Sequence, residues 1–399
     1  MTEVLKDIKA GYKETPLGLI PEDWEVKSID QTLTIGSGKD YKHLNEGKIP
    51  VYGTGGIMTY VDECLFNGES VGIGRKGTID KPVFLSGKFW TVDTLFFTHS
   101  FKSSLPKFIY YVFLTINWKR HNEASGVPSL SKTTIDKIKI PLPQLPEQQK
   151  IAEILTTVDD KIEVIEERIK QTQELKKGLM QRLLTKGIGH TKFKDSPLGE
   201  IPESWEVKCI RDFANVSAGG TPSTKVPEYW NGNIPWMNSG EINLRRIRSV
   251  EGRITEVGMN NSSTRLFESG TILMALAGQG KTRGKVAVTE IDTCTNQSLA
   301  GIFKLSNVSI EFLFQNLESR YSEIRKMSTG DGGRGGLNLS IINSIRVAVP
   351  PLKEQLKIAT ILSSIDAKLE AQYEKKTTYQ ELKKGLMQQL LTGKQRVNI

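Results

Sequence analysis

The stretch Leu145–Thr185 reads LPEQQKIAEILTTVDDKIEVIEERIKQTQELKKGLMQRLLT, and parts of it return 207 residues later, from Leu352, as EQLKIATIL and QELKKGLMQQLLT. Apolar residues in both copies recur at steps of four and three, which is typical of a long helix with one narrow apolar face. Pro146 near the first turn, and Gly187 and Gly393 beyond the last, are typical helix boundaries. A helix of about 38 residues is about 57 Å long at 1.5 Å per residue. Such a helix needs a partner, and we expect each copy to pack against the other.

The apolar spacing also predicts which residues form the seam between the two helices. They are Ile151, Leu155, Val158, Ile162 and Ile165 in the first helix, and Ile358, Leu362, Ile365 and Leu369 in the second. Both copies carry a glycine inside the pattern, Gly178 and Gly385. Glycine there costs roughly 1 kcal/mol relative to alanine. Either it is a tolerated kink, or the backbone must approach another chain closely at this point.

A second block is also repeated, but with a different spacing. Tyr12–Ile29 reads YKETPLGLIPEDWEVKSI and returns 181 residues later as FKDSPLGEIPESWEVKCI at Phe193–Ile210. The stretch between the two repeated blocks is therefore 26 residues longer in the second copy. A repeat of this length indicates a tandem pair of domains, not a solenoid. The length of 399 residues agrees, because it exceeds what one hydrophobic core usually supports.

Composition narrows the functional classes. The net charge of +9 points to a polyanionic partner, although basic proteins that merely need solubility share it. Cys64, Cys209 and Cys294 lie far apart, which fits neither a disulfide framework nor a zinc site and suits a reducing cytoplasm. The start of the chain has no apolar signal core, and the longest apolar run, Phe108–Ile116, is too short to span a bilayer. We therefore expect a cytoplasmic protein with no membrane association.

The middle of each copy reads as a mixture of strands and short helices, and its motifs favour binding over catalysis. Gly72–Gly77 fits GxGxxG, but a strand follows it where a nucleotide site would need a helix. It and the segment Gln279–Lys285 are better read as basic hairpin turns that can approach DNA. The sequence nearest to an adenine methyltransferase tetrapeptide, Val349–Leu352, lacks both the polar first residue and the aromatic last one. No carboxylate cluster of a metal nuclease stands out, so we expect no catalytic residues and no metal site.

The turns and loops of the two middles supply the candidate DNA-binding residues. They are Lys39, Tyr41, Lys42, Tyr52, Thr54, Arg75 and Lys76 in the first copy, and Thr221, Lys225, Gln279, Lys281, Arg283 and Arg334 in the second. Arginine and lysine can hydrogen-bond guanine and glutamine can hydrogen-bond adenine, but most of the cations are expected at phosphates. Because the two middles differ, we expect them to differ in what they contact.

The doubled order of PLGxIPxxWEV, a glycine-rich basic turn, EQxKIA and ELKKGLMQ resembles the specificity subunit of type I restriction-modification systems (the HsdS family). The resemblance implies an α+β fold, with two tandem-repeat globular α/β target-recognition domains separated by two long antiparallel coiled-coil helices. On this interpretation the first target-recognition domain spans 1–146 and the first spacer helix 147–187. The second domain then spans 188–350 and the second spacer helix 351–399.

The resemblance also implies the function and the partners. Each domain would read one half of a bipartite, asymmetric target in double-stranded DNA, and the helices would fix the spacer and dock two modification subunits. The chain itself would hold no cofactor: S-adenosylmethionine would lie on the modification subunits, and ATP and Mg²⁺ on restriction and translocase subunits. Two alternatives remain at this point. The chain could be a coiled-coil scaffold that binds proteins, or a methyltransferase or nuclease that acts alone.

Overall fold

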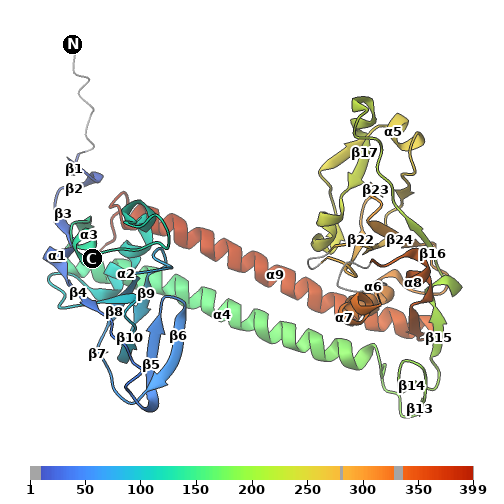
Figure 1. Cartoon of the computed structure of the whole chain (residues 1–399), viewed down its shortest axis with the longest axis horizontal. Coiled ribbons are helices and arrows are strands. Elements are labelled where there is room, and N and C mark those ends of the chain that lie inside the picture. Colours follow the sequence, from blue (N-terminus) through green and yellow to red (C-terminus); the bar gives the residue numbers. More distant parts are fainter. Residues whose placement is uncertain (1–9, 279–281, 328–335, 399) are drawn as a thin grey trace. The chain divides into compact units, whose positions relative to one another are not determined.

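The computed structural model describes residues 10–278, 282–327 and 336–398 (Figure 1). The chain divides into two compact units. Unit 1 comprises Met1–Glu167 and Tyr373–Ile399, and unit 2 comprises Arg168–Gln372. Each unit holds one globular domain together with part of each of the two long helices.

Unit 1 contains two four-stranded sheets. The first has the order β4 (Thr34–Ser37), β11 (Leu95–His99), β8 (Ser70–Gly74), β9 (Val83–Leu85). The second has the order β6 (Gly56–Val61), β5 (Glu46–Gly53), β10 (Lys88–Thr91), β7 (Phe66–Asn67). Two antiparallel ribbons complete the strands: β1 (Tyr12–Thr15) with β2 (Gly18–Pro21), and β3 (Glu25–Ser28) with β12 (Lys139–Leu142). The short helices are α1 (Ile29–Thr32), α2 (Pro106–Thr115), η1 (Trp118–His121) and α3 (Lys132–Asp136).

Unit 2 repeats this arrangement. Its first sheet has the order β16 (Asn215–Ala218), β24 (Leu299–Phe303), β21 (Ile272–Ala275), β22 (Val286–Thr289), β18 (Arg246–Ile247). The second has the order β19 (Gly252–Ile254), β17 (Trp230–Met237), β23 (Thr293–Thr295), β20 (Leu266–Phe267). The ribbons are β13 (Phe193–Lys194) with β14 (Ile201–Pro202), and β15 (Glu206–Cys209) with β25 (Arg346–Val349). The short helices are η2 (Ile210–Asp212), η3 (Pro227–Tyr229), η4 (Ser239–Leu244), α5 (Glu256–Asn260), α6 (Ile310–Ser319), α7 (Tyr321–Lys326) and α8 (Leu339–Ser344).

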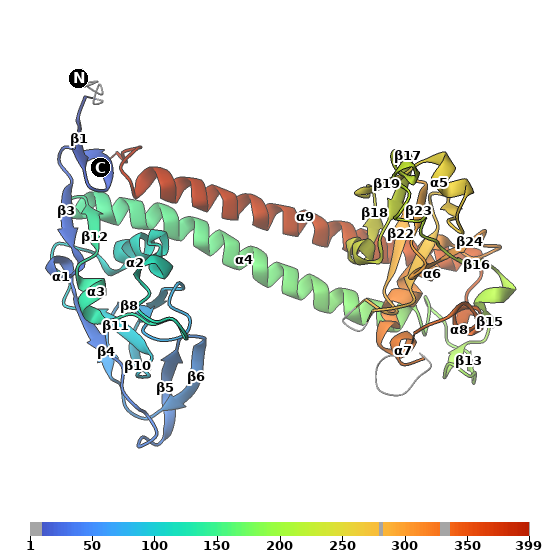
Figure 2. The ribbon, with the colours of Figure 1, turned by 45° about the horizontal axis from the view of Figure 1, so that its top comes forward.

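The two middles thus share one topology although their sequences have diverged. In both second sheets a parallel pair lies at the centre, β5 with β10 in unit 1 and β17 with β23 in unit 2. The clearest difference lies after the first strand of that pair. In unit 1, β5 turns into β6 through Thr54 and Gly55 alone, and this hairpin projects from the body of the unit (Figures 1 and 2). In unit 2 the corresponding connection runs over residues 238–251 and contains η4 and β18. Part of the added length of the second copy lies here.

The long helices are α4 (Leu145–Leu183) and α9 (Leu352–Leu390), each of 39 residues. They end earlier than the predicted limits of 187 and 399. The reason is local: Gly187 and Gly393 adopt positive φ, at 65° and 69°, and turn the chain back just beyond each helix. Helix α4 also begins two residues before the predicted 147, because Pro146 fits the first turn.

The helices pack antiparallel within each unit. In unit 1, Asp159 of α4 pairs with Lys383 of α9 at 2.6 Å, and Glu166 pairs with Lys376 at 2.9 Å. The α4 numbers rise as the α9 numbers fall, so the two segments run in opposite directions. In unit 2, Lys176 of α4 pairs with Asp366 of α9 at 2.7 Å. This is the same pair with the helices exchanged, because Lys176 and Asp159 are the repeat equivalents of Lys383 and Asp366. The antiparallel arrangement predicted from the sequence is confirmed.

The predicted seam residues are buried to different degrees. Ile151, Leu155, Val158, Ile165, Ile358 and Leu362 are buried, while Ile162, Ile365 and Leu369 are half-buried. Ile151 and Leu155 belong to the core of unit 1 together with Leu390. Ile358 and Leu362 belong to the core of unit 2 together with Leu183. The seam is therefore best buried where a globular domain covers the helix pair.

The two repeated sequence blocks contact each other, which explains why both recur. Trp24 is fully buried, and its indole N–H donates to Glu147 Oε2 in the first turn of α4 at 2.9 Å. In unit 2, Trp205 is equally buried and donates to Glu354 Oε2 at 3.1 Å. Beyond the helix ends, a Cβ on Gly393 would collide with Pro21. Each PLGxIPxxWEV block is thus a structural joint between a globular domain and the helix pair.

Candidate nucleic-acid interface

Five loop segments of unit 1 are hydrogen-bonded into one surface. The Lys39 N–H donates to Thr91 O at 2.8 Å, and the Val92 N–H donates to Tyr52 O at 3.0 Å. The Arg75 N–H donates to Thr94 O at 2.8 Å, and the Leu130 N–H donates to Arg75 O at 2.9 Å. The structure therefore brings the predicted residues of the 39, 52–54 and 75–76 segments together, although they are far apart in the sequence.

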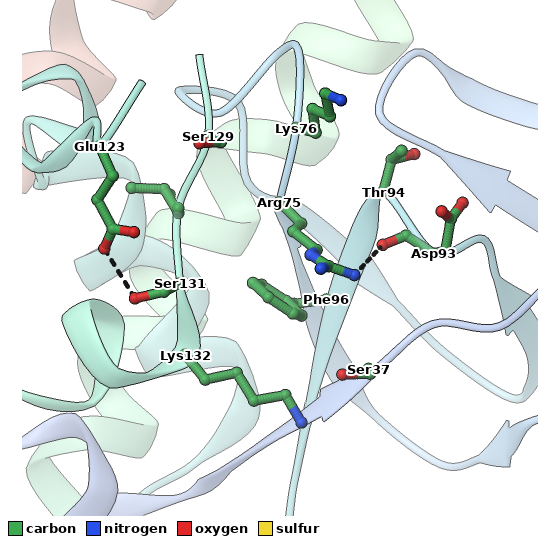
Figure 3. A pocket seen from close by; sticks show the side chains of 11 residues that line it. Ser37, Arg75, Lys76, Asp93, Thr94, Phe96, Glu123, Ser129, Ser131 and Lys132 are labelled. Atoms are coloured by element: carbon green, nitrogen blue, oxygen red, sulfur yellow. Dashed lines mark hydrogen bonds between the residues drawn. The ribbon is translucent and has the colours of Figure 1, made fainter. Parts of the chain in front are cut away.

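A pocket of about 620 Å³ opens on this surface, and it is shown in Figure 3. Its lining comprises Ser37, Arg75, Lys76, Asp93, Thr94, Phe96, Glu123, Ser129, Leu130, Ser131 and Lys132. Arg75 Nη1 donates to the backbone oxygen of Asp93 at 3.3 Å, and the guanidinium carbon lies 5.8 Å from the Phe96 ring centroid. Lys132 Nζ lies 6.0 Å from the same centroid. The pocket thus places two cations around one aromatic ring.

The same pocket also contains negative charge. The carboxylate of Glu123 accepts hydrogen bonds from Thr134 and from Ser131, the latter at 2.7 Å. These hydrogen bonds lower the pKa of Glu123, so its side chain stays ionised at neutral pH. With Asp93 exposed nearby, the surface offers acceptors as well as donors. Such a mixture suits polar groups of both kinds, as base edges present.

The remaining predicted residues of unit 1 lie around this pocket in different environments. Lys39 and Lys42 are exposed, whereas Tyr41 is half-buried and packs against the core cluster of Val51 and Trp90. This packing is enough to explain a tyrosine at position 41, with no need for a contact to DNA. The Trp90 indole donates to Lys39 O at 2.9 Å and so fixes the backbone from which the Lys39 side chain extends. The turn between β5 and β6 lies next to the basic turn at residues 75–77, since a Cβ built on Gly77 would stand 3.8 Å from Thr54 Oγ1.

The predicted residues of unit 2 are less uniform. Thr221 is half-buried and donates to Gln297 Oε1 at 2.5 Å, while Lys225 is exposed. Arg283 is only 8% exposed, whereas a base-reading side chain is expected to face solvent. Gln279, Lys281 and Arg334 lie outside the described residues.

The backbone scaffold of the surface is nevertheless the same in both units. The Gly220 N–H donates to Thr295 O as that of Lys39 does to Thr91 O, at 2.8 Å in each case. The Trp236 indole donates to Gly220 O at 3.0 Å, just as the Trp90 indole donates to Lys39 O. The two tryptophans come from different strands of the parallel pair, because Trp90 lies on β10 and Trp236 on β17. The two surfaces therefore share their backbone and differ in their side chains.

The loop at residues 124–132 also belongs to the unit 1 surface, and this was not predicted from the sequence. Lys76 forms a β-bridge with Ser129, and this bridge brings Ser129, Ser131 and Lys132 beside Arg75. The polar, glycine-bearing loop ASGVPSLSK at 124–132 was the available signal. Its pairing with the turn at 75–77 is a long-range contact, which local patterns do not reveal.

Unit 2 contains a further group of charges between its globular domain and its part of the helix pair. We call it the charge cluster: Lys176, Arg245, Glu318 and Asp366, with Gln315. Arg245 donates two hydrogen bonds to Glu318, at 2.5 and 2.6 Å, and lies 3.3 Å from Asp366. Lys176 lies 3.1 Å from Glu318, and Gln315 donates to Asp366 at 2.7 Å. All of these charges are paired, so the cluster joins domain to helices and does not form a reactive site.

Unit 1 has a simpler contact at the equivalent place. The Tyr111 hydroxyl donates to Asp159 Oδ2 at 2.9 Å, and Lys383 completes the group. Burial raises the pKa of Tyr111, so the hydroxyl keeps its proton and donates.

The described residues contain neither a cluster of candidate metal ligands nor a helix suited to cross a membrane. No three or more histidine, cysteine, aspartate or glutamate side chains gather there as metal ligands would. None of the helices in that part of the chain is both long and apolar enough to cross a membrane.

Comparisons with known proteins agree with this architecture. The Type I restriction modification DNA specificity domain matches residues 21–174 and 202–383. The chain is 29% identical to the type I restriction enzyme MjaVIII specificity subunit of Methanocaldococcus jannaschii, over 97% of this chain and 96% of that protein. It is 25% identical to the EcoR124I/EcoR124II specificity subunit of Escherichia coli, over 66% and 64% of the two chains.

A solved structure also has this fold. The type I restriction-modification S subunit from M. genitalium superposes with a TM-score of 0.66 at 15% identity, covering 92% of this chain and 96% of that one. The family match covers both repeats, and the M. jannaschii relative aligns over nearly the whole length. The chain therefore belongs to the family of type I restriction-modification DNA specificity subunits.

Proposed function

We propose that each globular domain reads one half of a bipartite, asymmetric target in double-stranded DNA. The observation that carries this proposal is the pair of loop surfaces, which share a backbone scaffold and present different side chains. A common scaffold lets both domains meet DNA by the same geometry, and different side chains select different bases. On this proposal residues 1–146 and 188–350 are the target-recognition domains, and DNA is contacted by the exposed predicted residues Lys39, Lys42, Arg75, Lys76 and Lys225.

We further propose that the chain specifies the target while partner subunits carry out the chemistry in the cytoplasm. Two modification subunits would bind S-adenosylmethionine, and restriction and translocase subunits would use ATP and Mg²⁺. Support for two modification subunits comes from the helices, because the sequence ELKKGLMQ occurs once on α4 and once on α9, and the same residues of it, the glutamate, the first leucine, the second lysine, the glycine and the glutamine, are exposed in both copies. Two equal sequences offer two equal docking positions.

Exchanging residues 30–140 for the corresponding residues of a relative tests the assignment of half-sites. Both repeated joints stay in the chain, so the exchanged domain should still attach to the helices. Methylome sequencing of a host that carries the chain and its modification subunit should then show a motif altered in one half only. A motif altered in both halves, or in neither, would refute the assignment.

A longer helix pair tests the role of the helices. One heptad added to both α4 and α9 lengthens each by about 10 Å, which is near three base pairs. The methylated motif should keep both half-sites and gain about three base pairs between them. An unchanged spacer would show that the helices do not measure it.

A further inference from the structure

Arg75 occupies a fixed position at the centre of the unit 1 surface. Its N–H donates to Thr94 O at 2.8 Å and its carbonyl accepts from the Leu130 N–H at 2.9 Å. The backbone is therefore held from both sides by two different loops. A side chain that starts from a fixed backbone loses less conformational freedom when it binds.

The guanidinium group is also oriented before any ligand arrives. Figure 3 shows it between Phe96 and the backbone of Asp93, which accepts its hydrogen bond at 3.3 Å. Within the described part of the chain this is the one hydrogen bond that the guanidinium makes. A guanidinium carries five N–H donors in a planar fork, so a pair of parallel donors remains available.

The charges around Arg75 favour a base edge over a phosphate. Asp93 and Glu123 line the same pocket as Arg75, Lys76 and Lys132. The two carboxylates offset most of the positive charge that would attract a phosphate group, and they add acceptors, which suit a base pair because it presents donors as well as acceptors. Guanine offers two acceptors, O6 and N7, in the major groove, and their spacing matches the donor fork of arginine.

Unit 2 has a different residue at this position. The Leu276 N–H donates to Ser298 O at 2.8 Å, and its carbonyl accepts from the Leu337 N–H at 2.9 Å. These are the same two backbone contacts as those of Arg75. Leu276 is half-buried and packs against the core of unit 2, and its side chain has no donor. The same backbone position thus carries a guanidinium group in the first domain and an apolar side chain in the second.

We propose that Arg75 reads a guanine in the half-site bound by the first domain, by paired hydrogen bonds to O6 and N7. Leu276 makes no such contact in the other half-site, so this position contributes to the asymmetry of the target. The inference rests on the proposed function, because it requires the first domain to bind DNA.

Site selection with the full chain and its modification subunit tests the proposal. A random DNA library is bound by wild type, Arg75→Ala and Arg75→Lys, and the affinity for each single-base variant of the selected target is measured. Arg75→Ala should reduce the preference for one G·C pair by about 5- to 150-fold and leave all other positions unchanged. Arg75→Lys keeps the charge but not the planar fork, so it should also lose part of that preference.

Lys76→Ala is the matched control, because Lys76 is the exposed neighbour on the same turn. It should weaken binding to all sequences alike and leave every base preference unchanged. Hydrogen exchange of β8 and β11 verifies that each variant is folded. The proposal is overturned if both Arg75 variants keep the wild-type preference, or if Arg75→Ala weakens all sequences equally. If wild type itself selects no sequence in either half, the proposed function fails, and the assignment of Arg75 fails with it.

Discussion

Each unit attaches a globular domain to its part of the helix pair, and the contacts that do so are only partly the same in the two units. In both, a buried tryptophan bonded to a glutamate joins the globular domain to the start of a long helix. Farther along the helix pair they differ. Unit 1 uses the hydroxyl of Tyr111 on Asp159, whereas unit 2 uses the charge cluster.

The difference follows from where the second copy gained residues. Arg245, Arg246 and Arg248 all lie in or beside β18, within the connection that replaces the two-residue turn of unit 1. Arg246 pairs with Glu311 at 2.6 Å, and Arg248 pairs with Glu290 and Glu370, each at 2.9 Å. The added residues therefore serve attachment within unit 2. A diverged domain can keep its surface scaffold and still change how it is held.

The largest expected effect tests what the two units share. Trp24→Ala and Trp205→Ala each remove a fully buried indole together with one of the donors to a glutamate, and other donors remain. Each should lower the free energy of unfolding of its own unit by about 3–5 kcal/mol. Hydrogen exchange of β12 reports on unit 1, and that of β25 reports on unit 2.

Leu244→Ala serves as the control, because Leu244 is 57% exposed and its loss should cost less than about 0.5 kcal/mol. Equal losses in the two tryptophan variants would support a common joint. A loss in only one unit would mean that the two joints, despite their shared sequence, contribute differently to the free energy of unfolding.

The second prediction tests what the units do not share. Glu318→Gln leaves Arg245 and Lys176 short of a charged partner. A fully buried pair broken in this way costs about 3–5 kcal/mol, but the Arg245 side chain is 38% exposed, so we expect about 2 kcal/mol. Asp159→Asn breaks a single ion pair in unit 1 and should cost about 1 kcal/mol.

Denaturant unfolding combined with hydrogen exchange of each unit measures both losses. Glu370→Gln is the control in unit 2, because its ion pair with Arg248 is exposed and solvent screens it, so its loss should change stability little. If Asp159→Asn were as costly as Glu318→Gln, the charge cluster would not distinguish the two units.

The pH dependence sharpens the same contrast. Burial alone would raise the pKa of Glu318, but its hydrogen bonds and charge contacts with Arg245 and Lys176 outweigh burial, so the pKa is lowered from 4.5. The pKa of Asp366 is lowered from 3.8, because hydrogen bonds from Lys176 and Gln315 and the charge of Arg245 likewise outweigh burial. Groups with a lowered folded pKa stabilise the fold above the unfolded pKa, and this stabilisation disappears as the pH falls through the folded pKa.

The advantage of wild type over Glu318→Gln should therefore be complete at pH 7 and shrink as the pH falls below about 4.5. Unfolding of unit 2 at pH 7, 5, 4 and 3 measures it, with Glu370→Gln as the matched variant. An advantage that is as large at pH 3 as at pH 7 would show that shape, and not charge, accounts for the effect of Glu318.

The sequence predicted the parts of the fold that depend on local periodicity. Both long helices and the tandem domains follow from apolar spacing and from the repeat, whereas the antiparallel pairing was implied by the family resemblance. The topology common to the middles could not be predicted, because equivalent contacts such as Arg75 with Thr94 and Leu276 with Ser298 are made by unlike residues. Backbone hydrogen bonds fix these positions, and they leave no mark on side-chain identity.

For the same reason, only part of the candidate site could be predicted. Arg75 and Lys76 stood out because a glycine-rich basic turn is visible in one segment. Lys132 and Asp93 did not, since only the folded chain places them beside Arg75. Arg283 has the right chemistry, but it is buried by the packing of unit 2.

The smallest expected effect concerns the glycines inside the long helices. Apart from the adjacent residues and the backbone of the same helix, no described atom lies within 4 Å of the place where a Cβ would stand on Gly178 or on Gly385. Gly178→Ala and Gly385→Ala should therefore each stabilise the isolated chain by about 0.5–1 kcal/mol. Thermal unfolding of the chain alone measures this gain, and it should be equal in the two variants because the surrounding sequence is the same.

The same two variants decide why glycine is present at both positions. If glycine is only tolerated, each variant should bind the modification subunit as wild type does. If the backbone must approach that subunit closely, the added methyl groups should weaken assembly although they stabilise the isolated chain. A titration of the modification subunit against wild type, each single variant and the double variant separates the two cases. Close approach at both positions predicts that each single variant loses one of two bound subunits and that the double variant loses both.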